Sequence, residues 1–119
     1  MTRETAARAV LRIRIDFPDR PSLGPGKIRL LETIGEAGSI SAAARAMEMS
    51  YRRAWLLVEE LNGMFAEPLV ATQLGGARGG GAVVTDTGRK VVAHYRELEE
   101  EAARATAPLL EGIEGISND

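Results

Sequence analysis

Only about three residues separate two helical patterns near the middle of the chain. The first pattern is short and alanine-rich, Ala42–Ala46, and Ser41 before it is a suitable N-cap residue. Ser50 can cap a second helix that runs to about Met64. Apolar residues along this second helix form a core-facing stripe at i, i+4, i+7 and i+11: Ala54, Val58, Leu61 and Phe65. So short a connection permits only a tight corner, which is typical of a helix-turn-helix.

One strand and one helix are expected before this pair. Apolar residues occupy alternate positions from Ala9 to Phe17, which is the period-2 pattern of a half-buried strand. A turn-rich connection follows over residues 18–26. Pro25 stands where a helix favours its first residue, and Gly38 predicts a left-handed cap at the end of that helix. Three apolar residues then recur on one helix face: Ile28, Leu31 and Ile34.

A hairpin is expected after the pair. Leu69–Leu74 and Ala82–Thr85 are typical of two short strands. The run Gly75–Gly81 between them predicts a flexible tip with one charged side chain, Arg78, which can reach a DNA backbone or minor groove. A glycine loop that cradles a nucleotide phosphate would have to precede a helix directly, and here a strand-like run intervenes.

A long last helix follows, and Thr85 or Thr87 can cap it. Its apolar residues are spaced by alternating steps of four and three, which predicts a heptad seam and hence a dimer interface. The seam consists of Val91, Tyr95, Leu98, Ala102 and Ala105. Pro108 should end the helix near residue 107, so that Leu109 lies beyond it.

This order of elements predicts an α+β fold that is mainly helical, a winged helix-turn-helix. An N-terminal strand and linker would occupy residues 1–24 and the winged helix-turn-helix residues 25–86. A dimerisation helix would occupy residues 87–107 and a frayed tail residues 108–119.

The composition narrows the function classes. The chain has no cysteine and a single histidine, His94, so thiolate zinc sites and cysteine nucleophiles are excluded and we expect no enzyme. No stretch approaches the roughly 20 apolar residues that span a bilayer, and no signal-peptide pattern opens the chain, so we expect a cytoplasmic protein with no membrane partner. Glu97–Glu101 is more typical of a solvated helix flank than of a cation site. Met47 and Met49 beside the corner are typical of core filler rather than of metal ligands.

The formal net charge of −2 argues against nucleic acid, but the distribution of charge matters more. Acidic residues concentrate in the last helix and the tail. Basic residues gather elsewhere, at Arg45, Arg52, Arg53, Arg78, Arg89 and Lys90. A locally basic face on an acidic chain is compatible with DNA binding.

In a winged helix-turn-helix the second helix of the corner enters the major groove, and its first turn makes the contacts. Arg52 is the best candidate for a bidentate guanine contact, and Ser50, Tyr51 and Arg53 are candidates for phosphate contacts. Two exposed arginines can also be merely solvated. Trp55 has two interpretations, as a residue packed on the first helix or as a base contact.

Two stretches resemble the N-terminal DNA-binding domain of the ModE family of molybdate-responsive regulators. The first is Gly38–Ala44 followed by Ser50–Trp55, and it is also similar to LysR-type regulators. The second is the glycine run with Ala82–Thr85 and Gly88. The resemblance, over about residues 25–105, implies a dimer joined through the first and last helices. It implies DNA contacts from the positions Ser50, Tyr51, Arg52, Arg53 and Arg78. Ser39 and Ser41 are further candidates for DNA contacts.

This chain departs from the family pattern in two ways. The family often has glycine at the helix-turn-helix corner, where this chain has Glu48, and a left-handed conformation there costs on the order of 1 kcal/mol. Full-length members also carry C-terminal oxyanion-binding domains, whereas this sequence stops at Asp119. We therefore expect no cofactor and no small-molecule ligand.

The sequence thus favours a dimeric, sequence-specific transcriptional regulator whose partners are double-stranded DNA and a second copy of the chain. The alternative is a winged-helix protein-interaction module that pairs with another regulator or with a separate sensor protein.

Overall fold

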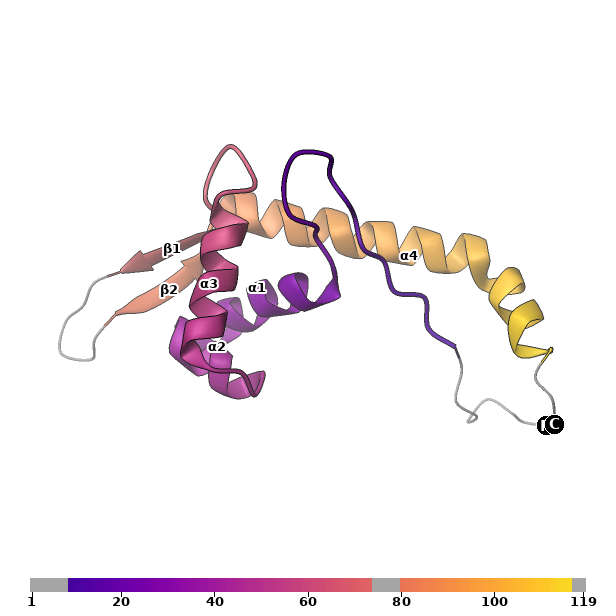
Figure 1. Cartoon of the computed structure of the whole chain (residues 1–119), viewed down its shortest axis with the longest axis horizontal. Helices are drawn as coiled ribbons and strands as arrows, with labels where there is room; N and C mark the ends of the chain where they lie inside the picture. Colours follow the sequence, from indigo (N-terminus) through magenta and orange to yellow (C-terminus); the bar gives the residue numbers. More distant parts are fainter. Residues whose placement is uncertain (1–8, 74–79, 117–119) are drawn as a thin grey trace.

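A computed structural model describes residues 9–73 and 80–116. It is mainly helical with one small antiparallel hairpin, which agrees with the expected winged helix-turn-helix (Figure 1). The elements are α1 (Pro25–Ala37), α2 (Ile40–Ala46), α3 (Tyr51–Asn62), β1 (Val70–Gln73), β2 (Gly81–Val84) and α4 (Asp86–Glu114). In the described residues no helix is both long and apolar enough to cross a membrane.

Local capping chemistry sets the helix ends. Gly38 adopts the left-handed conformation with φ of 82°, as expected, and ends α1. The Ser50 hydroxyl accepts a 3.0 Å hydrogen bond from the Arg53 amide at the start of α3. The prediction for α2 was wrong by two residues, because Ser39 rather than Ser41 is the N-cap and accepts from the Ala42 amide at 3.0 Å.

The corner between α2 and α3 is tight, as the spacing predicts. Glu48 has φ of 57°, so a non-glycine residue holds the left-handed conformation expected there, at a cost on the order of 1 kcal/mol. The Met49 amide donates to the Ala44 carbonyl at 2.9 Å and closes the turn. Met47 and Met49 both pack against the core, which confirms their interpretation as core filler.

A single apolar core joins α1, α3, the hairpin and the first half of α4. Its largest fully buried side chains come from α1, α3, α4 and the residue just before β1: Ile28, Leu30, Leu31, Ile34, Leu61, Tyr95 and Leu69. The stripe expected on α3 is buried at Ala54, Val58 and Leu61. The core therefore fixes α3 by one face and leaves its other face to solvent.

The expected N-terminal strand was wrong in one respect. Residues 9–17 are extended and alternate between exposed and half-buried, but they join no sheet. The Ile15 and Leu23 backbones form one isolated bridge, with hydrogen bonds of 2.8 and 2.9 Å. The half-buried side chains pack against the core instead, for example Phe17 edge-on to Phe65, which lies just beyond α3, with ring centroids 6.5 Å apart. An extended segment that packs one side against a core shows the same alternation of exposed and half-buried residues as a strand in a sheet, so the pattern does not require a neighbouring strand.

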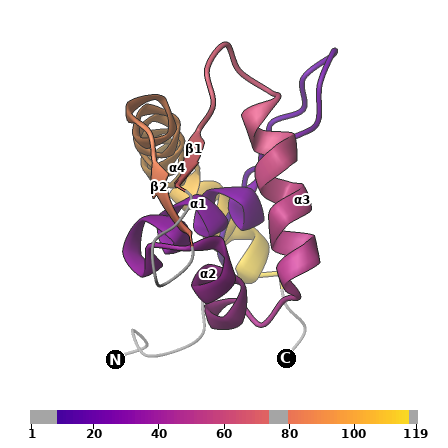
Figure 2. The ribbon, with the colours of Figure 1, turned by 90° about the vertical axis from the view of Figure 1, so that its left-hand side faces the viewer.

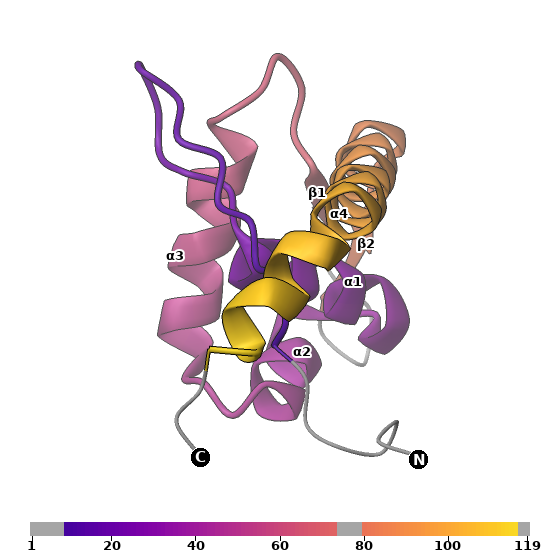
Figure 3. The same cartoon turned by 90° about the vertical axis from the view of Figure 1, so that its right-hand side faces the viewer.

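The expectation that Pro108 ends the last helix was also wrong, since α4 continues to Glu114. Proline at this position removes the hydrogen bond to the Arg104 carbonyl, and both residues are exposed, so water can serve that carbonyl. The last turns of α4 bend away from the line of the helix (Figure 1). The Ala9 amide donates to Glu114 at 2.6 Å, so the N-terminal segment accompanies α4 to this end (Figure 3).

Candidate nucleic-acid interface

The first two turns of α3 form the exposed part of the helix-turn-helix. Tyr51, Arg52, Arg53 and Trp55 are all exposed, as the prediction requires. The Ser50 side chain caps the helix through Arg53, so this hydroxyl already has a backbone partner. The helix places these residues on different sides, because successive residues turn by about 100°.

Tyr51 and Trp55 lie one turn apart on the flank of α3 that faces α2 and the hairpin. With Ser39, Ser41, Thr72 and Gln73 they line a groove of about 560 Å³, which we call the α3–hairpin groove. The hairpin and α3 stand on either side of α2 (Figure 2). Trp55 keeps 40% of its surface exposed and lines this groove, among whose described lining residues there is none of α1.

Arg53 lies on the opposite flank. It lines a smaller hollow of about 270 Å³ together with Lys27, Met47 and Leu57. The Lys27 ammonium is 2.9 Å from a Glu60 carboxylate oxygen, so its charge is already paired. The candidate residues therefore do not share one face: Tyr51 and Arg53 diverge, and the helical turn puts Arg52 between them.

The charge along α3 is asymmetric. Its first half carries Arg52 and Arg53 with no carboxylate, whereas Glu59 and Glu60 fall in its second half. Arg45 of α2 adds a third exposed cation, with Nη1 3.4 Å from the Ser41 hydroxyl. Within residues 9–73 and 80–116, no ion pair involves any of these three arginines. Positive charge is thus available at the amino-terminal end of α3 and along its border with α2.

Asn62 positions the hairpin against α3, and sequence reasoning missed it. Its side-chain oxygen accepts from the Leu69 amide at 2.8 Å and from the Val70 amide at 3.0 Å. Its side-chain amide donates to the Val70 carbonyl at 3.0 Å. The only signal was an asparagine at a helix end, which also suits an ordinary cap. At the other side of the hairpin, the Ala82 amide donates to the Gly38 carbonyl at 2.9 Å.

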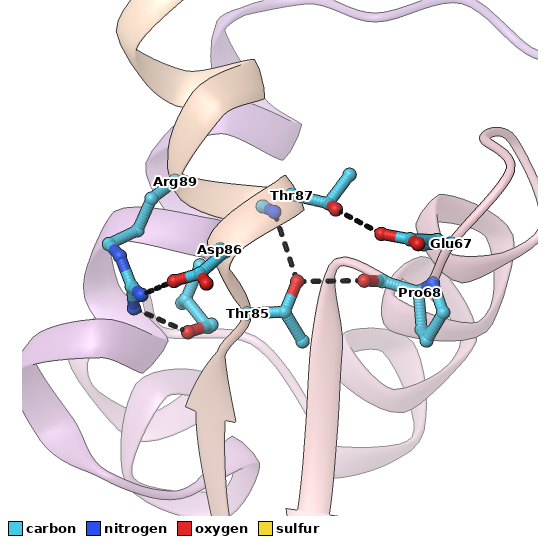
Figure 4. Close-up of polar contacts among 8 residues, drawn as sticks. Glu67, Pro68, Thr85, Asp86, Thr87 and Arg89 are labelled. Carbon is cyan, nitrogen blue, oxygen red and sulfur yellow. Dashed lines mark hydrogen bonds and ion pairs between the residues drawn. The ribbon is translucent and has the colours of Figure 1, made fainter.

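The junction between hairpin and α4 is fixed by side-chain hydrogen bonds (Figure 4). The Thr85 hydroxyl donates to the Pro68 carbonyl at 2.7 Å and accepts from the Gly88 amide at 3.0 Å, so Thr85 is the cap of α4. A side chain at Gly88 would come within 2.4 Å of the Leu69 carbonyl, so only glycine fits this close approach. The proposed tip residue Arg78 lies outside the described residues.

The predicted dimer seam divides into two parts. Tyr95 is only 2% exposed, and its hydroxyl donates to the Ile13 carbonyl at 2.5 Å. It belongs to the core of a single chain and not to a surface for a second copy, so that part of the prediction was wrong. Val91 is half-buried against the same core. Leu98, Ala102 and Ala105 remain at least partly exposed along α4.

An apolar hollow of about 570 Å³ lies where α1, β2 and α4 meet. Its lining includes the charged residues Glu32 and Arg89 and five larger apolar residues: Leu31, Val83, Val84, Val92 and Ala93. Arg96 bridges the two helices beside it, with 2.7 Å to Glu32 and 2.6 Å to Glu99. The hydrogen bond from Arg96 lowers the pKa of the Glu32 carboxyl below its ordinary value. The hollow is thus a mainly apolar surface formed in part by the first and last helices.

Residues 9–73 and 80–116 contain no group of three or more histidine, aspartate or glutamate side chains suited to holding a metal ion. His94 is exposed on α4, as expected.

Three curated relatives match this chain over most of its length. It is 40% identical over 113 residues, 95% of the chain, to the molybdenum transport protein ModE of Azotobacter vinelandii. It is 44% identical over 82 residues, 69% of the chain, to the molybdenum-pterin-binding protein MopB of Rhodobacter capsulatus. It is 38% identical over 76 residues, 64% of the chain, to the DNA-binding transcriptional dual regulator ModE of Escherichia coli K12. The chain is a ModE-family relative. No protein-family model matches the sequence.

The matched ModE and Mop proteins are longer than this chain. The chain spans 42% of the Azotobacter protein, 30% of MopB and 29% of the Escherichia coli regulator. These three relatives are named as a molybdenum transport protein, a molybdenum-pterin-binding protein and a DNA-binding transcriptional dual regulator.

Proposed function

We propose that this ModE-family chain binds double-stranded DNA as a homodimer and regulates transcription. The observation that carries the proposal is the first half of α3, which is exposed, cationic and free of carboxylates, and which stands beside a hairpin tied to it through Asn62. A helix fits the major groove, which is about 12 Å wide. The relationship to a protein named as a DNA-binding transcriptional regulator supports the same function.

Within this proposal the α3 residues have separate roles. The helical turn directs Arg52 away from the core face, where a guanidinium can meet guanine O6 and N7. Tyr51 and Arg53, on either flank, suit phosphates of the two strands that border the groove. Ser39 and Ser41 add hydroxyls at the border of α2, and Arg78 of the hairpin tip would reach the backbone or the minor groove.

The dimer would form through the first and last helices. The apolar hollow between α1, β2 and α4 offers a surface that a second copy can cover. Leu98, Ala102 and Ala105 lie further along α4 on another side of the helix, where they are at least partly exposed and would add a second contact surface. Two recognition helices joined in this way would engage half-sites about 34–36 Å apart.

The test is DNA binding by the purified chain and two matched double variants. Duplexes selected from a random pool identify the preferred sequence, and fluorescence anisotropy measures affinity. Arg52→Ala with Arg53→Ala should weaken binding by at least about a hundredfold, because one base contact and one phosphate contact are lost. Arg14→Ala with Arg104→Ala removes the same charge from residues paired with Asp16 and Glu101, and should bind nearly as wild type.

Equal affinity of the wild type and the Arg52/Arg53 variant would contradict this proposal.

The apolar hollow also favours a second candidate function, a protein-interaction module that pairs with another regulator. A dimer in sedimentation that binds no duplex at low salt would support that candidate instead.

A further inference from the structure

The α3–hairpin groove has a chemistry of its own. Ten of the described residues line it, and none of these is an aspartate or a glutamate. Hydroxyls of Ser41, Tyr51 and Thr72 and the amide of Gln73 line it with the indole of Trp55. Such a mixture of hydrogen-bond donors with one large apolar ring suits a sugar–phosphate chain, which has anionic oxygens and apolar sugar faces.

The charges at the borders of the groove agree with an anionic occupant. Arg45 stands beside Ser41, with Nη1 at 3.4 Å from its hydroxyl, and Arg52 follows Tyr51 on α3. Both guanidinium groups are exposed. The carboxylates of α3, Glu59 and Glu60, begin one turn beyond Trp55 and are absent from the lining. The groove therefore has two cations beside it, on α2 and α3, and no carboxylate among its described lining residues.

The position of the groove indicates which part of DNA would occupy it. When α3 lies in the major groove and the hairpin reaches the neighbouring minor groove, the DNA strand that separates the two grooves passes between α3 and the hairpin. Trp55 lies on the flank of α3 toward the hairpin, whereas Arg52 lies on the outward face. The indole thus meets the backbone of that strand and not the base edges.

We infer that the α3–hairpin groove holds the sugar–phosphate backbone of one DNA strand and that Trp55 contacts this backbone, a proposal that rests on the proposed DNA-binding function. Trp55 is then a positioning residue: it fixes how deeply and at what angle α3 enters the major groove. Its contribution to affinity is the same for every sequence, while Arg52 discriminates among sequences.

Trp55 is the only tryptophan of the chain, so its emission reports directly on this groove. The experiment titrates the full chain with two duplexes of unrelated sequence at low salt. Anisotropy of the labelled duplex measures binding, and acrylamide quenching measures the accessibility of Trp55. We expect each duplex to reduce quenching of Trp55 as it binds. A Trp55→Phe, His94→Trp variant is the control, because its tryptophan lies on exposed α4 and its quenching should not change.

Variants test the energetic role. Trp55→Ala should weaken binding of both duplexes by about tenfold, and by the same factor for each, because a lost backbone contact is independent of sequence. Arg52→Ala should instead reduce the ratio between the two affinities.

Three results would overturn the inference. If a duplex binds while Trp55 stays equally accessible and Trp55→Ala keeps its affinity, the groove is not used, and the proposed function stands without it. If Trp55→Ala changes the preference between duplexes, Trp55 reads bases and not the backbone. If neither duplex binds at low salt, both the inference and the proposed function fail. The quenching measurement on the wild type needs no variant to fold.

Discussion

The helical head and the far half of α4 differ in how completely their apolar side chains are buried. In the head, residues 25–84, large apolar side chains of α1, α3 and β1 are fully buried, and side-chain hydrogen bonds fix the hairpin. Beyond Tyr95, α4 buries no residue completely and leaves Leu109 and Ile113 mostly exposed, as is Ile116 just after its end. The head and the first half of α4 are therefore fixed by one core within the chain, whereas the far half of α4 has apolar surface that a second copy can cover. The comparison predicts that similar substitutions have very different effects in the two regions.

The sharpest comparison uses two leucines. Leu61→Ala removes a fully buried side chain from α3 and should lower the free energy of unfolding by about 2–5 kcal/mol. Leu109→Ala truncates a side chain that is 69% exposed, and should change the unfolding of the dilute protein by less than about 0.5 kcal/mol. Urea titrations followed by circular dichroism measure both values. Similar losses for the two variants would show that the far half of α4 is as tightly packed as the head.

A second prediction concerns Asn62, which joins the hairpin to α3. Asn62→Ala leaves the Leu69 and Val70 amides without their acceptor and should cost about 1–3 kcal/mol. Asn62→Asp keeps an acceptor for both amides and loses only the donor to the Val70 carbonyl, so it should cost less. Hydrogen exchange of the two amides is the measurement, and unchanged protection in the alanine variant would contradict this role.

Elements governed by neighbouring residues could be predicted from the sequence. The caps at Gly38, Ser50 and Thr85 follow from backbone needs that a few adjacent residues satisfy. The left-handed Glu48 was expected instead from the resemblance, because the ModE family often has glycine at this corner. Ser39 replaced the expected Ser41 because two serines near one helix start offer the same chemistry.

Features that depend on distant parts of the chain could not be predicted. A heptad spacing shows that Tyr95 is covered, but the same spacing results whether its own chain or a partner covers it. The bonds of Asn62 join residues seven and eight positions away and leave no periodic signal. Pro108 stays helical because the carbonyl that it leaves unpaired faces solvent, a fact that only the structure supplies.

The smallest expected effect concerns the ion pair that joins the head to α4 through Arg96 and Glu32. Arg96 lowers the pKa of Glu32 below its ordinary value of 4.5, so the ionised form stabilises the folded chain. This stabilisation is present above about pH 4.5 and is lost as the pH falls through the lowered pKa. The side chains are 34% and 39% exposed, and solvent screening limits the effect to below about 1 kcal/mol. Glu32→Gln should therefore flatten the fall in stability below pH 4.5, measured by thermal unfolding, whereas Glu101→Gln in a more exposed pair should not. An unchanged profile in Glu32→Gln would mean that this ion pair does not couple the head to α4, and that the buried Tyr95 and its neighbours hold the two regions together.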